Sequence, residues 1–456
     1  MKIFDTMSRE KKEFIPIEKG RVKLFVCGPT VYDYSHIGHA RTYIFFDLVA
    51  SYLRYKGYHV FYLQNITDID DKIINKGRLE NRDPIKISNE FMLKYFEDMR
   101  SLRVDSINIY APATYFIDRI IDQVQRLIKL GFAYETEDGV YFEVSKFKDY
   151  GKLSHQSLEN IKVGARVEIN EKKKNPIDFA LWKKKKEGEP YWPSPWGDGR
   201  PGWHIEDTAI TEYYFGPQYD IHGGGSDLIF PHHECEIAQM ESISGKKPMV
   251  NYWMHTGLLT IKEERMGKSM GNVINIREIV KKYEPELIRY FLLSSHYRSP
   301  IDFSYEKIEE IKQSWEKIII AQRKLMRIEA KKGKNYVKEI LDFRALIEKA
   351  LDDDFNTPEA ISLIQLFVNF LNKNMDNLGD EDIKESLKLF EDIDSIFKII
   401  PKEEISGGNL IQLLIDVRKM AKDKKIYEIS DYIREKLKEY NISIEDMQEG
   451  QLWYKK

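Results

Sequence analysis

The sequence predicts an α/β protein with a parallel sheet in its amino-terminal part and helices in its carboxyl-terminal part. Residues 24–27 form a short apolar run, and a glycine–proline turn separates them from a periodic segment at 38–56. A second apolar and aromatic run follows at 58–63, which completes a strand–helix–strand unit. From Tyr305 onward, apolar residues recur at helical spacing. At 456 residues, the chain is long enough for several domains.

Charge and cysteine usage exclude several classes of protein. A net charge of −3 with 32% charged residues describes a well-solvated chain, so any nucleic acid would have to be bound by local basic patches. The two cysteines, Cys27 and Cys235, cannot build a disulfide framework, and they suit a reducing cytoplasm. Charged residues interrupt the apolar runs, as Asp47 does within 43–53. We therefore expect no signal peptide and no membrane span.

The ends of the two predicted strands indicate where a ligand binds. In a parallel sheet, ligands bind at the carboxyl ends of the strands, and here Cys27 and residues 65–68 occupy those ends. The stretch His36-Ile37-Gly38-His39 stands at the start of the predicted helix. Unpaired N–H groups, a glycine and two imidazoles suit a phosphate group there. The alternative is a loop with two surface histidines.

Histidines and acids gather again between residues 202 and 241. Pro231 predicts a helix start, so His232 and Glu236 would share one helical face and could chelate a zinc ion. A surface histidine beside a carboxylate is the alternative. The glycines at 223–225 follow His222 and offer close backbone approach to a ligand, or else they form a plain turn.

A third stretch, at residues 263–272, predicts a charged, glycine-containing loop. Arg265 and Lys268 in such a loop can clamp a departing pyrophosphate. Taken alone, the stretch indicates only a charged loop.

In this order, the three stretches resemble the class I aminoacyl-tRNA synthetases, and among them the cysteinyl-tRNA synthetase family. Residues 36–39 match the HIGH signature of that family, 265–269 resemble its KMSKS signature, and 25–32 are similar to its cysteine-specific first strand. Further similar stretches lie at 65–72, 178–183, 220–225, 353–358 and 450–453. The resemblance therefore extends almost from end to end.

The resemblance implies a reaction in two steps. Cysteine and ATP give cysteinyl adenylate and pyrophosphate, and the cysteinyl group then passes to the 3′ end of tRNA(Cys). Catalysis of this kind depends on positioning and charge stabilisation. The catalytic residues that it implies are His36, His39 and Lys268. The implied ATP-binding residues, with Mg²⁺ accompanying ATP, are Gly38, His222, Gly223, Gly224, Asp227 and Lys268. The implied residues for L-cysteine are Cys27, Thr67, Trp203 and His232.

The resemblance also implies a zinc ion that tells cysteine from serine, because zinc stabilises a thiolate far better than it binds a hydroxyl group. The matching ligand positions are Cys27, Asp207, His232 and Glu236. Asp207 stands where the family has cysteine, and aspartate can ligate zinc through oxygen. Two alternatives stay open: Cys235, three residues after His232, could complete the site, or the zinc could be lost.

The KMSKS-like stretch departs from the family in two positions. Arg265 replaces lysine, which changes the donor geometry, and Gly267 replaces serine, which loosens the loop. Lys268 and Ser269 are retained, so activity is expected.

The resemblance implies a Rossmann-like class I catalytic domain with an inserted domain, then an α-helical bundle and a small C-terminal anticodon-binding region. The expected parts are the first catalytic half (1–112), the connective insertion (113–202), the second catalytic half (203–260), a stem-contact region with the KMSKS-like loop (261–310), the helical bundle (311–400) and the anticodon-binding region (401–456). A cytoplasmic monomer is expected. The tryptophans at 182, 192, 196 and 453 could stack on bases, and core packing or docking of the tail is the alternative.

Two other functions remain conceivable from the sequence. A cysteine ligase could use the same adenylate chemistry on a small amine, although the helical tail argues against it. A metal-less tRNA-binding paralogue is conceivable because of Asp207, although His36, His39 and Lys268 argue against it. A nicotinamide dehydrogenase is disfavoured because no G-x-G-x-x-G stretch follows the first strand.

Overall fold

The computed structural model describes residues 1–157, 172–261, 264–265, 273–330, 335–402, 408–447 and 450–455. They form two compact units, one of Met1–Ser304 with Ala350–Pro358 and one of Tyr305–Lys349 with Glu359–Lys456. No helix in this described part of the chain is long and apolar enough to cross a membrane. Lys268, Gly267 and Ser269 of the KMSKS-like stretch lie outside the described residues.

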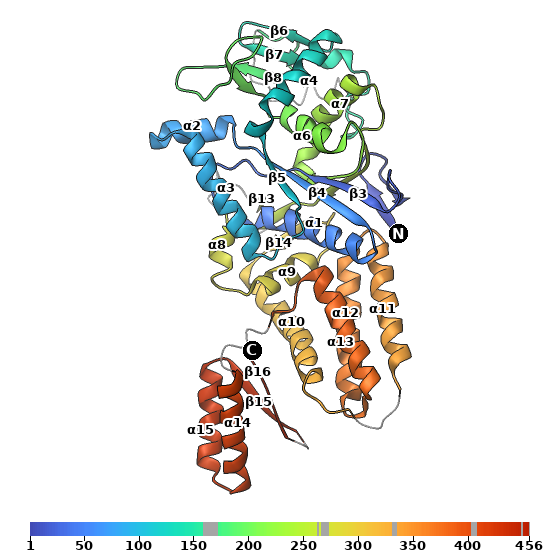
Figure 1. Cartoon of the computed structure of the whole chain (residues 1–456), viewed down its shortest axis with the longest axis vertical. Helices are drawn as coiled ribbons and strands as arrows, with labels where there is room; N and C mark the ends of the chain where they lie inside the picture. Colours follow the sequence, from blue (N-terminus) through green and yellow to red (C-terminus); the bar gives the residue numbers. More distant parts are fainter. Residues whose placement is uncertain are drawn as a thin grey trace. The chain divides into compact units, whose positions relative to one another are not determined.

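The first unit is built on a five-stranded parallel sheet with the strand order β11-β10-β3-β4-β5 (Figure 1). Its strands are β3 (Arg21–Val26), β4 (His59–Ile66), β5 (Ile109–Pro112), β10 (Tyr219–Gly225) and β11 (Val250–Thr256). Helix α1 (Ile37–Tyr55) connects β3 to β4. The predicted strand–helix–strand unit is therefore confirmed. The helix begins one residue earlier than expected, because His36 caps it.

The core lies on both faces of this sheet. Leu24, Phe25 and Val26 of β3 are fully buried, which is typical of a parallel strand covered by helices on each side. Most of α1 is also buried, so its sequence is apolar almost all round. Two helices, α2 (Asp71–Glu80) and α3 (Pro84–Ser101), follow β4 before the chain enters β5.

After β5, the chain leaves the sheet and forms a smaller layer of its own. It contains α4 (Ile117–Lys129) and a four-stranded antiparallel sheet of β6 (Ala133–Glu135), β7 (Gly139–Phe142), β8 (Phe179–Lys184) and β9 (Gly199–Pro201). Trp182 is fully buried and Trp196 is 8% exposed. For these two tryptophans, core packing is confirmed over base stacking.

The chain then returns to the parallel sheet. Helix α6 (Ile205–Phe215) leads into β10, and α7 (Glu234–Ser244) leads into β11. Smaller elements complete the unit: the hairpin of β1 (Lys2–Asp5) and β2 (Glu10–Glu13), the small sheet of β12 (Leu259–Ile261), β13 (Glu264–Arg265) and β14 (Ile301–Phe303), and the helices α8 (Ile276–Ile279) and α9 (Pro285–Leu293).

The second unit is helical, as predicted. Its helices are α10 (Tyr305–Leu325), α11 (Val337–Asp352), α12 (Thr357–Asn374), α13 (Asp380–Phe397), α14 (Gly408–Asp423) and α15 (Tyr427–Glu439). The last two lie within the expected anticodon-binding region at 401–456. Helix α14 and the hairpin of β15 (Ile442–Met447) and β16 (Gly450–Lys455) were not predicted.

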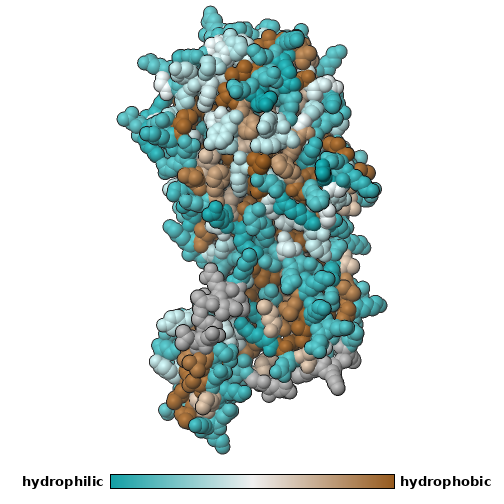
Figure 2. All heavy atoms as spheres, in the orientation of Figure 1, coloured by the Kyte–Doolittle hydropathy of each residue, from teal (hydrophilic) through white to brown (hydrophobic). Residues whose placement is uncertain are grey.

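The carboxyl-terminal hairpin forms because packing favours it. Ile442 and Ile444 of β15 and Leu452 of β16 are buried in a small core with Ile433 and Leu437 of α15. The indole Nε1 of Trp453 donates to Gln412 Oε1 at 3.0 Å, which docks this side chain on α14. Figure 2 shows an apolar stripe over α14 and α15, where exposed side chains include Leu413, Val417 and Met420.

Candidate functional site

The amino terminus of α1 presents two imidazoles in a fixed arrangement. His36 is the N-cap, and its Nδ1 accepts from the backbone N–H of His39 at 3.3 Å. In return, Nδ1 of His39 accepts from the backbone N–H of His36 at 3.3 Å. The two rings stack with their centroids 3.7 Å apart. Because both Nδ1 atoms accept, both Nε2 atoms carry the proton.

This arrangement suits a phosphate group. The free N–H groups of a helix amino terminus and its partial positive charge attract anions. Two Nε2–H donors stand beside that terminus, and Gly38 adds no side chain between them. The predicted phosphate site at residues 36–39 therefore has donors of the right kind, held by the backbone.

The segment before α1 pairs with the chain that follows the KMSKS-like stretch. The N–H of Ile37 donates to Ile274 O at 3.0 Å, and the N–H of Ile276 donates to Ser35 O at 3.0 Å. Arg277 adds an ion pair to Asp98 at 2.9 Å. Lys268 lies outside the described residues, and the chain from 274 to 276 is held at the amino terminus of α1.

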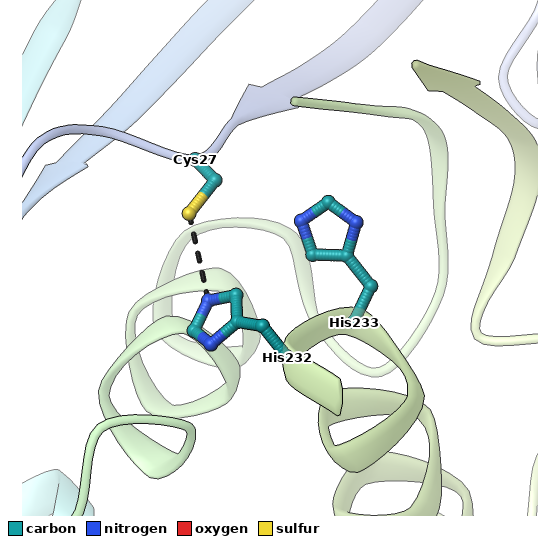
Figure 3. A group of neighbouring side chains, drawn as sticks. All are labelled: Cys27, His232 and His233. Atoms are coloured by element: carbon teal, nitrogen blue, oxygen red, sulfur yellow. Dashed lines mark hydrogen bonds between the residues drawn. The ribbon is translucent and has the colours of Figure 1, made fainter. Parts of the chain in front are cut away.

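A second group of donors lies where β3 ends. The thiol Sγ of Cys27 is 3.5 Å from Nε2 of His232 (Figure 3). The same sulfur is 3.4 Å from Oδ2 of Asp207. Nε2 of His232 is also 3.0 Å from Oδ2 of Asp207 and 3.2 Å from Oε1 of Glu236. We call these four residues the Cys27 cluster. They come from three separate parts of the sequence, and all four are buried.

Helix α7 begins later than predicted, but the predicted contact between His232 and Glu236 is present. The α-helix begins at Glu234, and His232 lies in the irregular turn Ile229–His233 just before it. The turn continues into α7, so residues four apart still meet. His232 and Glu236 are therefore neighbours, as their spacing predicts.

Burial and like charges act on the titratable groups of the cluster. Burial raises the pKa of the Cys27 thiol well above its usual value, and the carboxylates of Asp207 and Glu236 raise it further. Burial also raises the pKa of Glu236 well above its usual value, again with Asp207 contributing. Each shift penalises a negative charge that lacks a cation. A divalent cation at the centre would reverse both shifts.

The structure shows that these residues fit a metal ion. Oδ1 of Asp207 and both carboxylate oxygens of Glu236 are buried, and none of them has a hydrogen-bond partner among the described residues. Tetrahedral zinc, with bonds of about 2.0–2.3 Å, separates its donor atoms by about 3.3–3.7 Å. The four donor distances of 3.0–3.5 Å in the cluster are close to that spacing. One thiolate, one imidazole and two carboxylates form a donor set that zinc accepts.

The alternative ligand, Cys235, points elsewhere. Its Sγ is 3.2 Å from the hydroxyl of Tyr150, and its side chain is packed in the apolar core. Burial raises the pKa of its thiol, and no metal-binding group among the described residues includes it. The structure therefore favours Asp207 over Cys235 as the fourth donor.

Further buried histidines surround the cluster, and the sequence predicted no role for most of them. Nδ1 of His204 is 2.8 Å from Nδ1 of His232, and Nδ1 of His233 is 2.8 Å from Nε2 of His255. Burial lowers the pKa of His233 well below its usual value and that of His255 to about 3. These rings are neutral and can orient the donors beside them. The adjacent pair at 232–233 was the only local signal for His233.

His222, one of the predicted ATP-binding residues, lies inside the protein. It is fully buried, its Nδ1 is 2.7 Å from the hydroxyl of Tyr219, and it is 3.7 Å from Oε2 of Glu236. The glycines after it belong to β10 and form no turn. A Cβ at Gly223 would come within 2.3 Å of the Phe46 ring, and one at Gly224 within 2.8 Å of His233. Their lack of side chains lets α1 and that ring pack.

The remaining predicted residues are Trp203, Thr67 and Asp227. The indole of Trp203 is 37% exposed and stacks on His232, with ring centroids 4.4 Å apart. Thr67 is buried just after β4 and donates its hydroxyl hydrogen to Glu206. Asp227 lies in the turn Ser226–Leu228 that follows β10. Glu206 is a buried carboxylate that the sequence analysis gave no role.

Comparison with known families and proteins matches almost the whole chain. Residues 13–313 match the model described as the tRNA synthetases class I (C) catalytic domain, and residues 347–400 match the DALR domain. The cysteine–tRNA ligase of Thermoplasma volcanium is 49% identical over 100% of both chains. That of Carboxydothermus hydrogenoformans is 46% identical over 99% of both chains.

Solved structures show the same fold at much lower identity. A methionyl-tRNA synthetase of Mycobacterium tuberculosis in complex with methionyl-adenylate superimposes with a TM-score of 0.64 at 16% identity, over 87% of this chain and 94% of that one. A leucyl enzyme of Agrobacterium radiobacter, LeuRS, in a ternary complex with tRNA and LeuAMS, has a TM-score of 0.64 at 11% identity, over 85% of both chains. These structural similarities show that this chain has the fold of a class I synthetase.

Proposed function

Because the chain belongs to the cysteine–tRNA ligase family of class I aminoacyl-tRNA synthetases, we propose that the Cys27 cluster selects cysteine and that the amino terminus of α1 activates it with ATP. The activity itself is that of a cysteine–tRNA ligase, an ATP-dependent enzyme that acts on tRNA, an amino acid and ATP. The observation that carries the proposal is the convergence of a thiol, an imidazole and two carboxylates at 3.0–3.5 Å beside the end of β3.

For activation, we assign the phosphates of ATP to His36 and His39. Their Nε2–H donors and the amino terminus of α1 favour negative charge, and Gly38 leaves space for it. In the reaction, a carboxylate oxygen of the amino acid attacks the α-phosphorus, and pyrophosphate leaves with the electrons of the broken P–O bond. Charge that builds on these oxygens is stabilised by fixed donors. We assign the departing pyrophosphate to Lys268 and Mg²⁺ to ATP.

For selection, we propose that Cys27, Asp207, His232 and Glu236 would hold a zinc ion. When bound, zinc supplies a centre that favours a thiolate over a hydroxyl group, which separates cysteine from serine. His204 orients the ring of His232, so that the Nε2 lone pair faces the centre. Trp203 covers that ring, and its exposed edge faces an incoming amino acid.

For the rest of the nucleotide, we propose Gly223, Gly224 and Asp227, which lie at the carboxyl end of β10 beside α1. His222 lies under Glu236, and we propose that it supports this carboxylate. The support for Gly223 and Gly224 is indirect: their missing side chains bring α1 and His233 close to the strand.

For tRNA(Cys), we propose the six-part division of the chain given by the resemblance, with the acceptor end near the insertion at 113–202 and the anticodon near 401–456. A monomer in the cytoplasm fits this proposal, since the Cys27 thiol has to stay reduced in order to bind a metal ion. The match of residues 347–400 to the DALR domain favours tRNA as the acceptor over a small amine.

Two measurements on the purified full-length protein test these assignments. Metal analysis is expected to find one zinc ion for each chain. Exchange between ATP and pyrophosphate is expected to depend on cysteine and to fail with serine. Exchange that depends on another amino acid would contradict the assignment of the pocket to cysteine. A metal-free protein with full cysteine-dependent exchange would contradict the role of zinc.

A further inference from the structure

A cavity lies at the end of the parallel sheet opposite the Cys27 cluster. Its volume is about 480 Å³, and its walls are the first residues of β3 and β4 and the last residues of α1 and α6. Cys27 and residues 65–68 stand at the other ends of the same two strands. Six residues of extended strand span roughly 20 Å, so the cavity is separate from the proposed catalytic site. The function described so far gives it no role.

Two cations line this cavity without an ion pair. Lys23 of β3 and Arg54 of α1 both face it, and neither contacts a carboxylate of any described residue. Arg54 lies in the last turn of α1, where the partial negative charge of the helix attracts it, and Asp47 and Asp105 act on it from beyond contact distance. The nearest acid to Lys23 is Asp220, whose Oδ2 accepts from the backbone N–H of Lys23 at 2.8 Å.

Both cations keep hydrogen-bond donors in reserve. Nζ of Lys23 carries three hydrogens, and it gives one to Phe215 O at 3.1 Å. The hydrogen bonds of Arg54, the shortest to Ser106 O at 2.8 Å, all come from Nη2. Nη1 and Nε of Arg54 have no partner in the part of the chain that the structure describes. These donors suit an anionic group in the cavity.

The remaining walls are largely aromatic. Tyr58 and Phe61 come from the start of β4, and Tyr214 and Phe215 come from the end of α6. The Phe61 ring lies 6.0 Å from that of Tyr214 and 5.6 Å, edge to face, from that of Phe215. A planar ring packs well among such side chains. Sites for small molecules measure about 300–1,000 Å³ and combine apolar walls with a few polar groups, as this cavity does.

The rim of the cavity carries a weak ion pair. Arg21 and Glu18 are 2.8 Å apart, with side chains 66% and 51% exposed. Pairs this exposed contribute about 0–1 kcal/mol, so Arg21 can turn toward an anion at little cost. Of the described residues that line the cavity, Glu18 is the only acid, against the cations of Arg21, Lys23 and Arg54. The lining therefore favours negative charge.

We propose that this cavity binds a small planar anion, namely an aromatic ring that carries one carboxylate or phosphate group. The ring lies among Tyr58, Phe61 and Tyr214, and the acidic group accepts from Lys23 and Arg54. Because the cavity is at the opposite ends of the strands, the anion binds together with ATP and cysteine and competes with neither. It is a second ligand site, and it does not depend on the proposed catalytic roles.

Four small probes test the two parts of this ligand. The full-length protein, with its nucleotide site saturated by ATP, is titrated in NMR experiments with phenyl phosphate, benzoate, benzyl alcohol and inorganic phosphate. At least one of the two aromatic acids is expected to have a Kd about tenfold or more below those of benzyl alcohol, which lacks charge, and phosphate, which lacks a ring. The tighter of the two acids shows whether the acidic group is a phosphate or a carboxylate.

Two outcomes of the titration would overturn the inference. One is that neither aromatic acid binds more tightly than benzyl alcohol and inorganic phosphate. The other is that the aromatic acid binds only when ATP is absent, because it would then occupy the catalytic crevice.

The substitution Lys23→Met removes the charge at the cavity and keeps most of the side-chain length. It is expected to raise the Kd for the tighter aromatic acid by about tenfold and to leave that for benzyl alcohol unchanged. A matched control is Lys56→Met, because Lys56 follows α1 two residues after Arg54 but pairs with Asp352 at 3.3 Å and does not line the cavity. An equal loss of binding in this control would overturn the inference, since general charge attraction would then explain it.

A second variant carries the test if Lys23→Met folds poorly. Tyr214→Leu removes an aromatic wall, and no hydrogen bond of the described residues depends on its hydroxyl group. It is expected to weaken the aromatic acid and benzyl alcohol alike, and to leave cysteine-dependent ATP–pyrophosphate exchange at the wild-type rate. Unchanged binding of the aromatic acid in Tyr214→Leu would contradict the placement of the ring.

Discussion

Two groups of buried polar side chains in the first unit differ in how their charges are balanced. Asp47 of α1 and Arg289 of α9 are both fully buried, and their ion pair is 2.8 Å long. Asp47 also accepts from the backbone N–H groups of Asp105 and Ser106, at 3.1 and 3.0 Å. Every charge of this pair has a partner within the protein, so the pair holds helices together.

The Cys27 cluster is equally buried, but no lysine or arginine of the described residues forms an ion pair with its two carboxylates, whose partner is the imidazole of His232. Asp207 Oδ1 and both oxygens of Glu236 have no hydrogen-bond partner in the part of the chain that the structure describes, and burial raises the pKa of the Cys27 thiol. Natural proteins rarely leave buried polar atoms unpaired, since each costs about 1–3 kcal/mol. Burial alone therefore does not tell a structural ion pair from a ligand-binding site. Buried charge that the protein fails to neutralise marks the place of a ligand.

The largest expected effect concerns the satisfied pair. Asp47→Ala leaves Arg289 as a buried charge without its carboxylate, so the free energy of unfolding is expected to fall by about 3–5 kcal/mol. Urea denaturation at neutral pH measures it. Zinc bound per folded chain is expected to stay unchanged. A loss of zinc without a loss of stability would contradict the assignment of a structural role to the Asp47–Arg289 pair.

The next effect concerns the unsatisfied cluster. Asp207→Ala is expected to lower zinc affinity by more than about a hundredfold, because it removes a direct ligand and even outer partners are worth 10- to 100-fold. The metal-free variant is expected to be no less stable than metal-free wild type, since one buried acid is relieved. Competition with a chelator measures the zinc affinity. Urea denaturation with excess chelator measures the stability of the metal-free protein.

Asp207→Cys is the matched control, because it restores the ligand that the family has at this position. It is expected to bind zinc at least as tightly as wild type. Full zinc content in Asp207→Ala would instead point to a three-ligand site or to Cys235.

A smaller effect on zinc affinity is expected from His204, which contacts the proposed ligand His232. For Nε2 of His232 to offer a lone pair, its Nδ1 must carry the proton and donate to His204 Nδ1, 2.8 Å away. His204→Ala removes that acceptor and is expected to weaken zinc binding by about 10- to 100-fold. The same chelator competition gives the value. An unchanged affinity would show that other neighbours hold the ring.

The smallest effect concerns an ion pair of the second unit that joins the buried Arg418 to the partly exposed Asp446. The hydrogen bond from Arg418 lowers the pKa of Asp446 below its usual value, with Lys422 contributing. A lowered pKa stabilises the folded state above the usual carboxyl pKa, and this stability is lost as pH falls. Because Asp446 is 34% exposed and the amide of asparagine keeps an oxygen that accepts from Arg418, Asp446→Asn is expected to cost about 1 kcal/mol at pH 7.

Urea denaturation of wild type and of Asp446→Asn at pH 7 and at more acidic pH checks the sign. The difference in the free energy of unfolding should shrink toward acid pH. A difference that grows there would contradict the shift.

Local patterns predicted the parts of the fold that depend on neighbours in sequence. The strand–helix–strand unit and the helices of the second unit follow from apolar periodicity. The contact between His232 and Glu236 follows from their spacing, although the helix begins two residues later than His232. Helix α14 and the hairpin β15–β16 were missed, since their short apolar runs become a core only when packed together.

Some residues of the candidate site could likewise be predicted from local motifs, and others could not. The motifs led to Cys27, His36, His39 and His232, because each stands at the end of a strand or the start of a helix. Nothing local distinguished Asp207 from Cys235 as the fourth donor, or assigned a role to Glu206. A contact between residues 27 and 207 depends on how α6 and the turn after β10 lie over the sheet.

By itself, the sequence determined the chemistry available to this protein: the parallel sheet, the histidines at a helix start, and a set of thiol, imidazole and carboxylate donors. Only the tertiary structure decided which donors share one buried centre and which face away, as Cys235 does toward Tyr150. The physical reason is that periodicity and spacing report neighbours within a few residues, whereas the site joins side chains about two hundred positions apart. Their uncompensated charge exists only once the fold has removed them from water.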